Sequence, residues 1–244
     1  MVNSRKNSII EEITFSADEF KLKGYLHLPP LPNPPFVIGC HGLFADKNSP
    51  KQIELAQYCN QLNMAYFRFD HRGCGESKAP LEAVTSLKAR CTDLKAAKNM
   101  LRARDDLGDK MGLFGSSMGG CVCLAVAHDL APRAVVTWAA PIRSADLAPP
   151  HDDPAGSLNI PFKNNPFDIR TSLEGLRNIL IFHSDADQTV PLSHAQEIYE
   201  CVSDPKKLVV FPNSDHRMSQ PADQQAFLQQ ASLWFQTCLK PEKL

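Results

Sequence analysis

The sequence predicts an α/β protein in which a mostly parallel central sheet is covered by helices on both faces. Two observations carry this prediction. Six short apolar runs recur along the chain, and their apolar residues are consecutive rather than alternating, which is typical of parallel strands buried on both faces. Longer amphipathic segments separate most of these runs, and strand and helix in alternation indicate an open α/β sheet.

The six runs are expected to form the parallel part of the sheet. They cover residues 36–40, 64–69, 111–114, 134–138, 178–182 and 207–211. Ahead of them, residues 9–15 and 20–28 resemble two antiparallel strands that are joined by a turn at 16–19.

Five amphipathic segments predict helices, at 53–62, 84–101, 118–130, 193–202 and 221–239. The second has an apolar stripe that repeats at three- and four-residue steps or their sums and consists of Val84, Leu87, Cys91, Leu94 and Leu101. This stripe is expected to face the sheet. The basic side chains expected outside it are Lys88, Arg90, Lys95 and Lys98.

Length and charge narrow the class of protein. The chain has 244 residues, which suits one domain spanning 1–244, and a net charge of −1, which gives no basic footprint for nucleic acid or an anionic membrane. The longest apolar stretch, 121–127, is too short to cross a membrane, and the polar start at 1–8 lacks the apolar region of a signal peptide. A cytoplasmic protein is expected, with its eight cysteines reduced and buried.

Eleven of the 19 prolines lie in two segments, 29–35 and 141–166. The first is expected to be a rigid surface loop between strands. The second interrupts the strand and helix alternation for about thirty residues, and a loop of that length in a compact domain is usually functional or disordered. A small cap over a site is therefore predicted at about 142–171, the alternative being a surface loop without substrate contact.

A Gly-x-Ser-x-Gly sequence, Gly115 to Gly119, follows the apolar run at 111–114 and opens the next predicted helix. In this strand, turn and helix context the pattern indicates a nucleophile elbow, in which Ser117 sits in a strained turn and bulkier neighbours would collide. The alternative is a glycine-rich turn that only packs the helix on the sheet. A serine nucleophile also needs a histidine base and a carboxylate, and both follow in order: two aspartates after the run at 178–182, and His216 after the run at 207–211.

These motifs resemble the α/β-hydrolase superfamily, and within it the single-domain esterases with a small cap, such as cinnamoyl and feruloyl esterases. The family's acid motif, His-Gly-x-x-Asp-x-x-Val-Pro, aligns from His183 to Pro191 and implies Asp187 as the acid. Ser184 stands where the family has glycine, which keeps Asp185 as an alternative. The resemblance also implies that His183 orients the acid loop and that residues 70–77 form a structural loop near the site.

The tetrahedral intermediate needs two hydrogen-bond donors. One is expected to be the backbone amide of Met118, directly after the nucleophile. By resemblance to the family's His-Gly-x loop, the other is the amide of Leu43, with His41 bracing the loop. The expected substrate pocket is lined by Phe44, Ile160, Phe162 and Phe167.

The predicted function is that of a serine hydrolase, a carboxylesterase acting on small to mid-sized esters through an acyl-enzyme. A thioesterase or amidase with the same triad is the first alternative, and a noncatalytic ligand-binding protein on a hydrolase scaffold is the second. No pattern for a cofactor or a metal is found, and the expected partner is a small-molecule ester. The sequence does not predict the oligomeric state.

Overall fold

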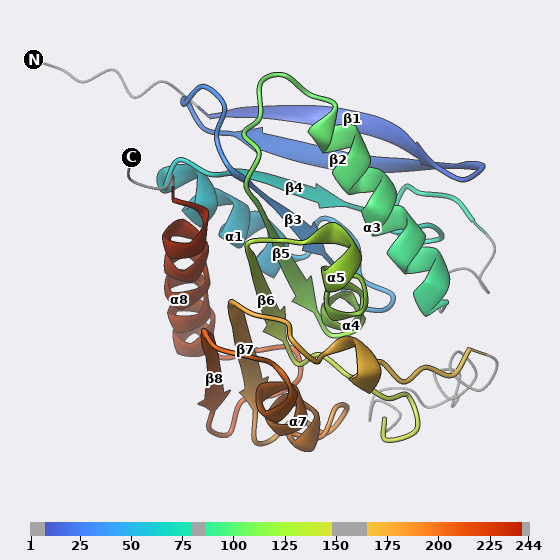
Figure 1. The fold of residues 1–244 in the computed structure, drawn as a ribbon, viewed down its shortest axis with the longest axis vertical. Coiled ribbons are helices and arrows are strands. Elements are labelled where there is room, and N and C mark those ends of the chain that lie inside the picture. The colour runs from blue at the N-terminus through green and yellow to red at the C-terminus, as the bar shows by residue number, and fades with distance from the viewer. Residues whose placement is uncertain (1–7, 80–85, 148–164, 241–244) are drawn as a thin grey trace, which may run out of the picture.

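A computed structural model describes residues 8–79, 86–147 and 165–240, and its centre is one eight-stranded sheet (Figure 1). The strand order is β1-β2-β4-β3-β5-β6-β7-β8. The first two strands form an antiparallel hairpin, β2 pairs antiparallel with β4, and the six strands from β4 to β8 pair in parallel. The strands are β1 (Ile9–Ala17), β2 (Phe20–Leu28), β3 (Phe36–Cys40), β4 (Ala65–Phe69), β5 (Met111–Ser116), β6 (Ala134–Trp138), β7 (Ile179–Ser184) and β8 (Lys206–Phe211).

Helices cover both faces of this sheet (Figure 1). Two apolar clusters lie between helices and sheet, one including Leu55 of α1 and Phe227 of α8, the other including Leu94 of α3 and Ile198 of α7. The predicted α/β architecture, mostly parallel with two covered faces, is thereby confirmed. The helices are α1 (Pro50–Gln61), α3 (Leu87–Arg102), α4 (Met118–Ala125), α5 (Ala127–Leu130), α7 (Ser193–Cys201) and α8 (Pro221–Leu239), with a 3-10 turn at Arg170–Ser172.

The predicted helix at 118–130 is wrong as a single element. It breaks at Val126, whose φ of −109° and ψ of 6° are not helical, so that α4 and α5 are separate. α5 then ends at Ala131, which adopts the left-handed conformation with φ 47° and precedes Pro132. A residue before proline is disfavoured in the right-handed helical region, which gives a local reason for this end.

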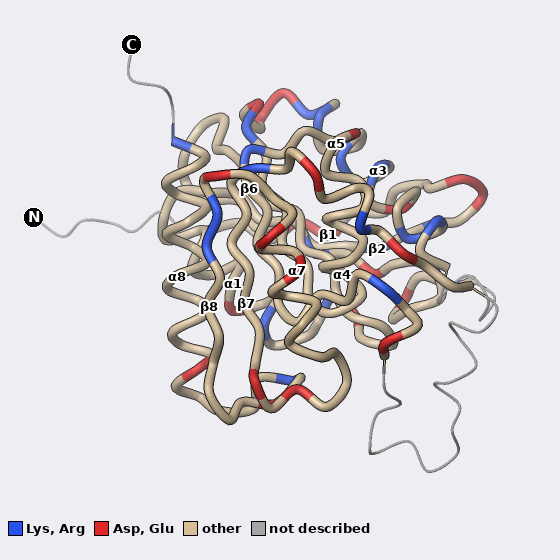
Figure 2. Tube along the Cα trace, turned by 60° about the horizontal axis from the view of Figure 1, so that its bottom comes forward, with Lys and Arg blue, Asp and Glu red and all other residues tan. Residues whose placement is uncertain are grey.

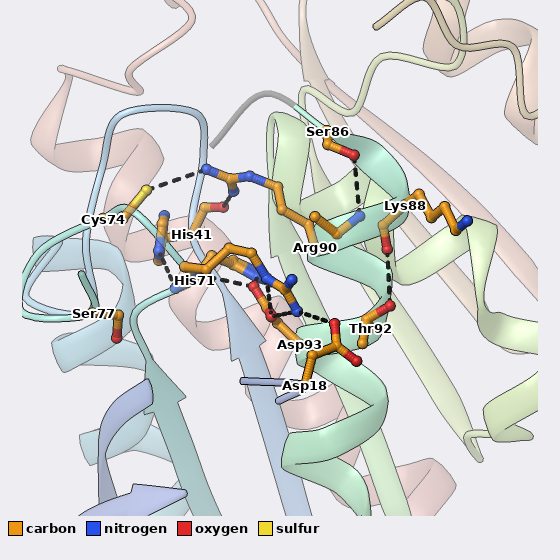
Figure 3. A network of polar contacts seen from close by, with 12 residues as sticks. Asp18, His41, His71, Cys74, Ser77, Ser86, Lys88, Arg90, Thr92 and Asp93 are labelled. Carbon is orange, nitrogen blue, oxygen red and sulfur yellow. Dashed lines mark hydrogen bonds and ion pairs between the residues drawn. The ribbon is translucent and has the colours of Figure 1, made fainter. Parts of the chain in front are cut away.

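Arg90 is the main correction to the predicted helix stripes. The sequence placed it outside the apolar face of α3, but its side chain is fully buried. Its guanidinium donates to the backbone carbonyl of His41 at 3.4 Å and to Cys74 Sγ at 3.4 Å (Figure 3). Because its polar tip reaches these acceptors, the long side chain is buried beneath the loop after β3 instead of extending into water.

The cysteines are all free thiols, and five of them are buried. Cys91 and Cys238 are half-buried, while Cys201 at the end of α7 is exposed, so the predicted burial is wrong for Cys201.

Charged residues of both signs are interspersed along the described chain (Figure 2). In the described ranges, no helix combines the length and apolar character needed to cross a membrane.

Acid is expected to destabilise the protein through buried His27. This residue is 4% exposed, and its Nε2 accepts a hydrogen bond from Arg68 Nε at 2.8 Å. Burial and the adjacent Arg68 charge lower the pKa of His27 from 6.5 to about 4. Between these pH values the unfolded chain binds a proton that the folded chain does not, so the free energy of unfolding falls as the pH drops, by about 2–3 kcal/mol for this residue.

Urea unfolding at pH 7.0 and 4.5 measures this loss. His27→Gln is expected to show a smaller loss than the unmodified protein, whereas His128→Gln, at an exposed position, is expected to leave it unchanged. Equal losses in the unmodified protein and His27→Gln would contradict the assignment. Part of the loss remains in every variant, because burial also lowers the pKa of His41, His183 and His194.

Candidate active site

The predicted site residues meet at the carboxyl edge of the parallel strands. Leu43 follows β3, Ser117 follows β5, Asp187 follows β7 and His216 follows β8. Ligands of open α/β sheets bind at this edge, because the loops that leave neighbouring strands converge there.

The turn between β5 and α4 holds Ser117 in a backbone conformation that residues other than glycine rarely adopt, with φ 52° and ψ −122°. The flanking glycines are required by close backbone approaches. A Cβ atom on Gly115 would lie 2.3 Å from the carbonyl oxygen of Gly119, and one on Gly119 would lie 2.2 Å from the carbonyl oxygen of Cys40. The Ser117 N–H donates to the Trp138 carbonyl at 2.7 Å, which ties the strained turn to β6.

A continuous chain of hydrogen bonds joins Ser117, His216 and Asp187. The distance from Ser117 Oγ to His216 Nε2 is 3.0 Å, and the distance from His216 Nδ1 to Asp187 Oδ2 is 2.7 Å. Because a carboxylate only accepts, Nδ1 of the imidazole donates to it, and Nε2 of the neutral ring accepts from the serine hydroxyl. The Asp187 side chain is fully buried, whereas 22% of the His216 side chain is exposed.

The acid loop holds Asp187 as a carboxylate. Its Oδ1 accepts from the backbone N–H groups of Thr189 and Val190, each at 2.9 Å. Burial alone would raise the pKa of Asp187, but the hydrogen bonds from His216 and from these amides hold it below its usual value. His183 donates from Nε2 to the carbonyl of Val190 at 2.9 Å, so it contacts the acid loop as the family resemblance implied.

The second aspartate has a different partner. Asp185 Oδ1 accepts from the N–H of Asn213 at 2.7 Å and so joins the loops after β7 and β8. Ser184, which replaces the family's glycine, makes a similar connection, because its hydroxyl donates to the carbonyl of Ser214 and accepts from the N–H of Ala186. Of the two candidate acids, the structure therefore brings Asp187 to His216.

The loop after β3 lies against the predicted nucleophile. A Cβ atom on Gly42 would be 3.5 Å from Ser117 Cβ, so this backbone passes close to the serine. His41 donates from Nδ1 to the carbonyl of Gly42 at 2.7 Å, and the N–H of Leu43 lies on the opposite side of the same planar peptide. The first N–H groups of a helix have no carbonyl partner within it, which leaves the Met118 amide, at the start of α4, free of helical bonding.

The ring of His41 is fixed by the neighbouring loop at 70–77. The N–H of His71 donates to His41 Nε2 at 3.1 Å, which requires the neutral tautomer that carries its proton on Nδ1 (Figure 3). Burial, together with the charges of His71 and Arg90, lowers the pKa of His41 well below its usual value. Lys47 and Asp70 join the same two loops through a buried ion pair of 2.8 Å. Residues 70–77 are therefore a structural loop beside the site, as predicted.

The predicted substrate-pocket residues are only partly described. Phe44 is 50% exposed and has a positive φ of 56°, whereas Phe167 is buried in the apolar cluster that also contains Leu94 and Ile198. Ile160 and Phe162, with the middle of the predicted cap, lie outside the described residues. The two flanks of that segment pair with each other, since the N–H of Ser144 donates to the carbonyl of Phe167 at 3.0 Å.

Two supporting residues were missed from the sequence. Trp138 donates from its indole nitrogen to the carbonyl of His216 at 2.8 Å, and Lys51 donates from Nζ to the carbonyl of Arg217 at 2.5 Å. Burial lowers the pKa of Lys51 to about 8. Neither residue belongs to a motif, so no sequence signal marks them.

Comparison with known proteins identifies the family and the fold of the chain. A family model described as "alpha/beta hydrolase fold" matches residues 34–156, which is half of the chain, and one for the prolyl oligopeptidase family matches residues 161–242. The uncharacterized protein YfhR of Salmonella typhi is 30% identical over 193 residues, covering 74% of this chain and 63% of that protein. The chain thus spans less than two thirds of the length of its first curated relatives.

Two further similar proteins have a named activity or a bound ligand. The mitochondrial palmitoyl-protein thioesterase ABHD10 of Rattus norvegicus is 24% identical over 221 residues, covering 78% of this chain and 71% of that protein. The structure of Est1E from Butyrivibrio proteoclasticus with ferulic acid bound aligns with a TM-score of 0.70 at 18% identity, over 90% of this chain and 99% of that one. The family match, the shared fold and the elbow after β5 together show that the chain belongs to the α/β-hydrolase superfamily.

Proposed function

We propose that the protein is a serine hydrolase that cleaves carboxylic esters through an acyl-enzyme on Ser117. The observation that carries this proposal is the unbroken chain from Ser117 Oγ through the His216 imidazole to the buried Asp187 carboxylate, with distances of 3.0 and 2.7 Å. A hydroxyl in contact with a neutral imidazole can lose its proton as it attacks a carbonyl carbon, and the carboxylate stabilises the imidazolium that results.

The proposed reaction has two stages. Ser117 Oγ attacks the ester carbonyl while His216 takes its proton, and the N–H groups of Leu43 and Met118 bind the oxyanion of the tetrahedral intermediate. The C–O bond to the alcohol then breaks, and His216 returns the proton to the departing alcohol. Water attacks the acyl-enzyme by the same route, which releases the carboxylic acid and restores the serine.

The substrate class is proposed as small to mid-sized uncharged esters. Phe44 supports an apolar acyl or aromatic group, because its half-exposed ring follows the proposed oxyanion donor directly. The predicted cap at about 142–171 would contribute the rest of the pocket. Thioesters are the second candidate class, since the ABHD10 relatives carry the name of palmitoyl-protein thioesterases. Amides are the third, since the family model that matches residues 161–242 is that of the prolyl oligopeptidases.

A fluorophosphonate probe followed by digestion and mass spectrometry tests the proposal. We expect a single adduct on Ser117 and its absence after heat denaturation. Turnover is then compared for p-nitrophenyl esters of increasing acyl length, an aromatic ester, an acyl-CoA and an anilide. Highest kcat/KM on the esters supports the carboxylesterase, and highest kcat/KM on the acyl-CoA or the anilide favours a rival class. A native protein without adduct and without turnover of any substrate would contradict catalysis altogether.

A further inference from the structure

Trp138 contacts both halves of the proposed catalytic pair. Its backbone carbonyl accepts from the N–H of Ser117 at 2.7 Å, and its indole N–H donates to the backbone carbonyl of His216 at 2.8 Å. These two partners are 99 residues apart in the chain. A single residue at the end of β6 is therefore hydrogen-bonded to the backbone of both the nucleophile and the base.

The backbone of Trp138 is fixed by the sheet. It pairs with Ser116 in the parallel register of β5 and β6, directly before the nucleophile turn. Ser117 leaves β5 near the middle of the sheet, whereas His216 follows β8 at its edge, with β6 and β7 between them. Trp138 spans part of this separation from a strand that is hydrogen-bonded to neighbours on both sides.

The indole ring is equally constrained. It is fully buried, with the rings of Phe211 and Phe227 at centroid distances of 5.9 and 6.4 Å. The ammonium of Lys51 lies 5.9 Å from the indole and donates to the carbonyl of Arg217, the residue after the base. Two successive carbonyls of the base loop, at 216 and 217, are thus held by side chains from β6 and α1.

We infer that Trp138 is a positioning residue that fixes the distance between the Ser117 hydroxyl and the His216 imidazole through its two hydrogen bonds. The inference rests on the proposed function. Without the indole N–H, the buried side of the base loop loses its partner, and the ring of His216 is free to shift relative to the serine. Proton transfer requires heavy atoms within about 3 Å, and a displacement of about 1 Å can cost about 100-fold in rate.

Trp138→Phe removes the indole N–H and keeps an aromatic ring in the core. We expect kcat to fall by about 10- to 100-fold with KM changed by less than about twofold, because the variant changes the geometry of the reacting groups and not substrate binding. Phosphonylation of Ser117 by the fluorophosphonate is expected to slow by a similar factor, since the same base assists it.

The chain supplies a matched control in its only other tryptophan. Trp234 on α8 donates its indole N–H to the carbonyl of Asn178 at 3.2 Å, directly before β7 and so at the amino end of the parallel strands, away from the site. Trp234→Phe loses the same type of hydrogen bond and is expected to lower the melting temperature by a comparable amount, with kcat and phosphonylation unchanged. Equal kcat in both variants would overturn the positioning role.

If Trp138→Phe does not fold, Lys51→Met tests the same loop from α1, because it removes the donor to the neighbouring carbonyl of Arg217. We expect a fall in kcat of about three- to tenfold, as for one hydrogen bond, with partial recovery in Lys51→Arg. An unchanged kcat in Lys51→Met would then show that His216 stays in place without side-chain donors to the carbonyls of its loop, which would overturn the inference. A failure of the proposed function can be told apart from a failure of this inference, because in the former case the unmodified protein itself shows neither turnover nor an adduct on Ser117.

Discussion

Replacing Ser117 with alanine is expected to lower kcat on the best ester by about 10⁴- to 10⁶-fold, the range typical of a missing serine nucleophile. The hydroxyl forms the acyl-enzyme, and no other group within reach of His216 Nε2 replaces it among the described residues. The residual rate comes from the proposed oxyanion donors and from substrate binding. Folding is expected to persist, because alanine adds no atom to the turn, although the positive φ remains.

Ser116→Ala is the control for this experiment. Ser116 is the last residue of β5 and directly precedes Ser117, but it lacks the glycine spacing of the elbow, and the hydrogen bond to His216 Nε2 comes from Ser117. Its kcat is expected to stay close to that of the unmodified protein. Full turnover by Ser117→Ala, or loss of the fluorophosphonate adduct in Ser116→Ala alone, would show that the nucleophile is assigned wrongly.

The second large effect is expected for Asp187→Asn, with kcat lower by about 10⁴-fold. Oδ1 accepts two backbone N–H groups, so the asparagine carbonyl is expected to take that place and its amide to face His216 Nδ1. Two donors then meet, and the imidazole must carry its proton on Nε2, where it no longer accepts from Ser117. The rate measured across pH 6 to 9 is expected to remain low throughout.

Asp185→Asn separates the two candidate acids. Its carboxylate accepts from the Asn213 N–H at 2.7 Å, and an asparagine carbonyl accepts the same bond. Nearly unchanged kcat is therefore expected, with normal labelling of Ser117. The assignment of the acid fails if Asp185→Asn is the variant that loses activity and Asp187→Asn retains it.

The parallel part of the sheet could be predicted because most of its strands are continuous apolar runs, a pattern that burial on both faces imposes on the sequence. The helix ends were harder. The apolar pattern of residues 118–130 continues through Val126, yet the backbone breaks there, since apolar periodicity marks burial and not backbone angles. Arg90 was misplaced for a related reason: its acceptors on His41 and Cys74 come from other loops, which no helical pattern of α3 contains.

In the site, the order of serine, acid and histidine after successive strands made Ser117 and His216 predictable. The choice between Asp185 and Asp187 needed the family motif, and the contact at 2.7 Å with His216 supports it. Trp138 and Lys51 were not predictable. Their hydrogen bonds reach the base loop from residues 78 and 166 positions away in the chain, and such contacts depend on the relative placement of strands that local patterns do not encode.

The order of strands also places the proposed reaction across regions of unequal stability. The nucleophile leaves β5, which has strands on both sides, whereas the base leaves β8, which is paired on one side only and has Phe211 as its one buried residue. Strands at a sheet edge with few buried side chains open more readily than central ones. A brief detachment of β8 would move His216 away while Ser117 stays in place, so the protein would lose its proposed activity reversibly before it unfolds.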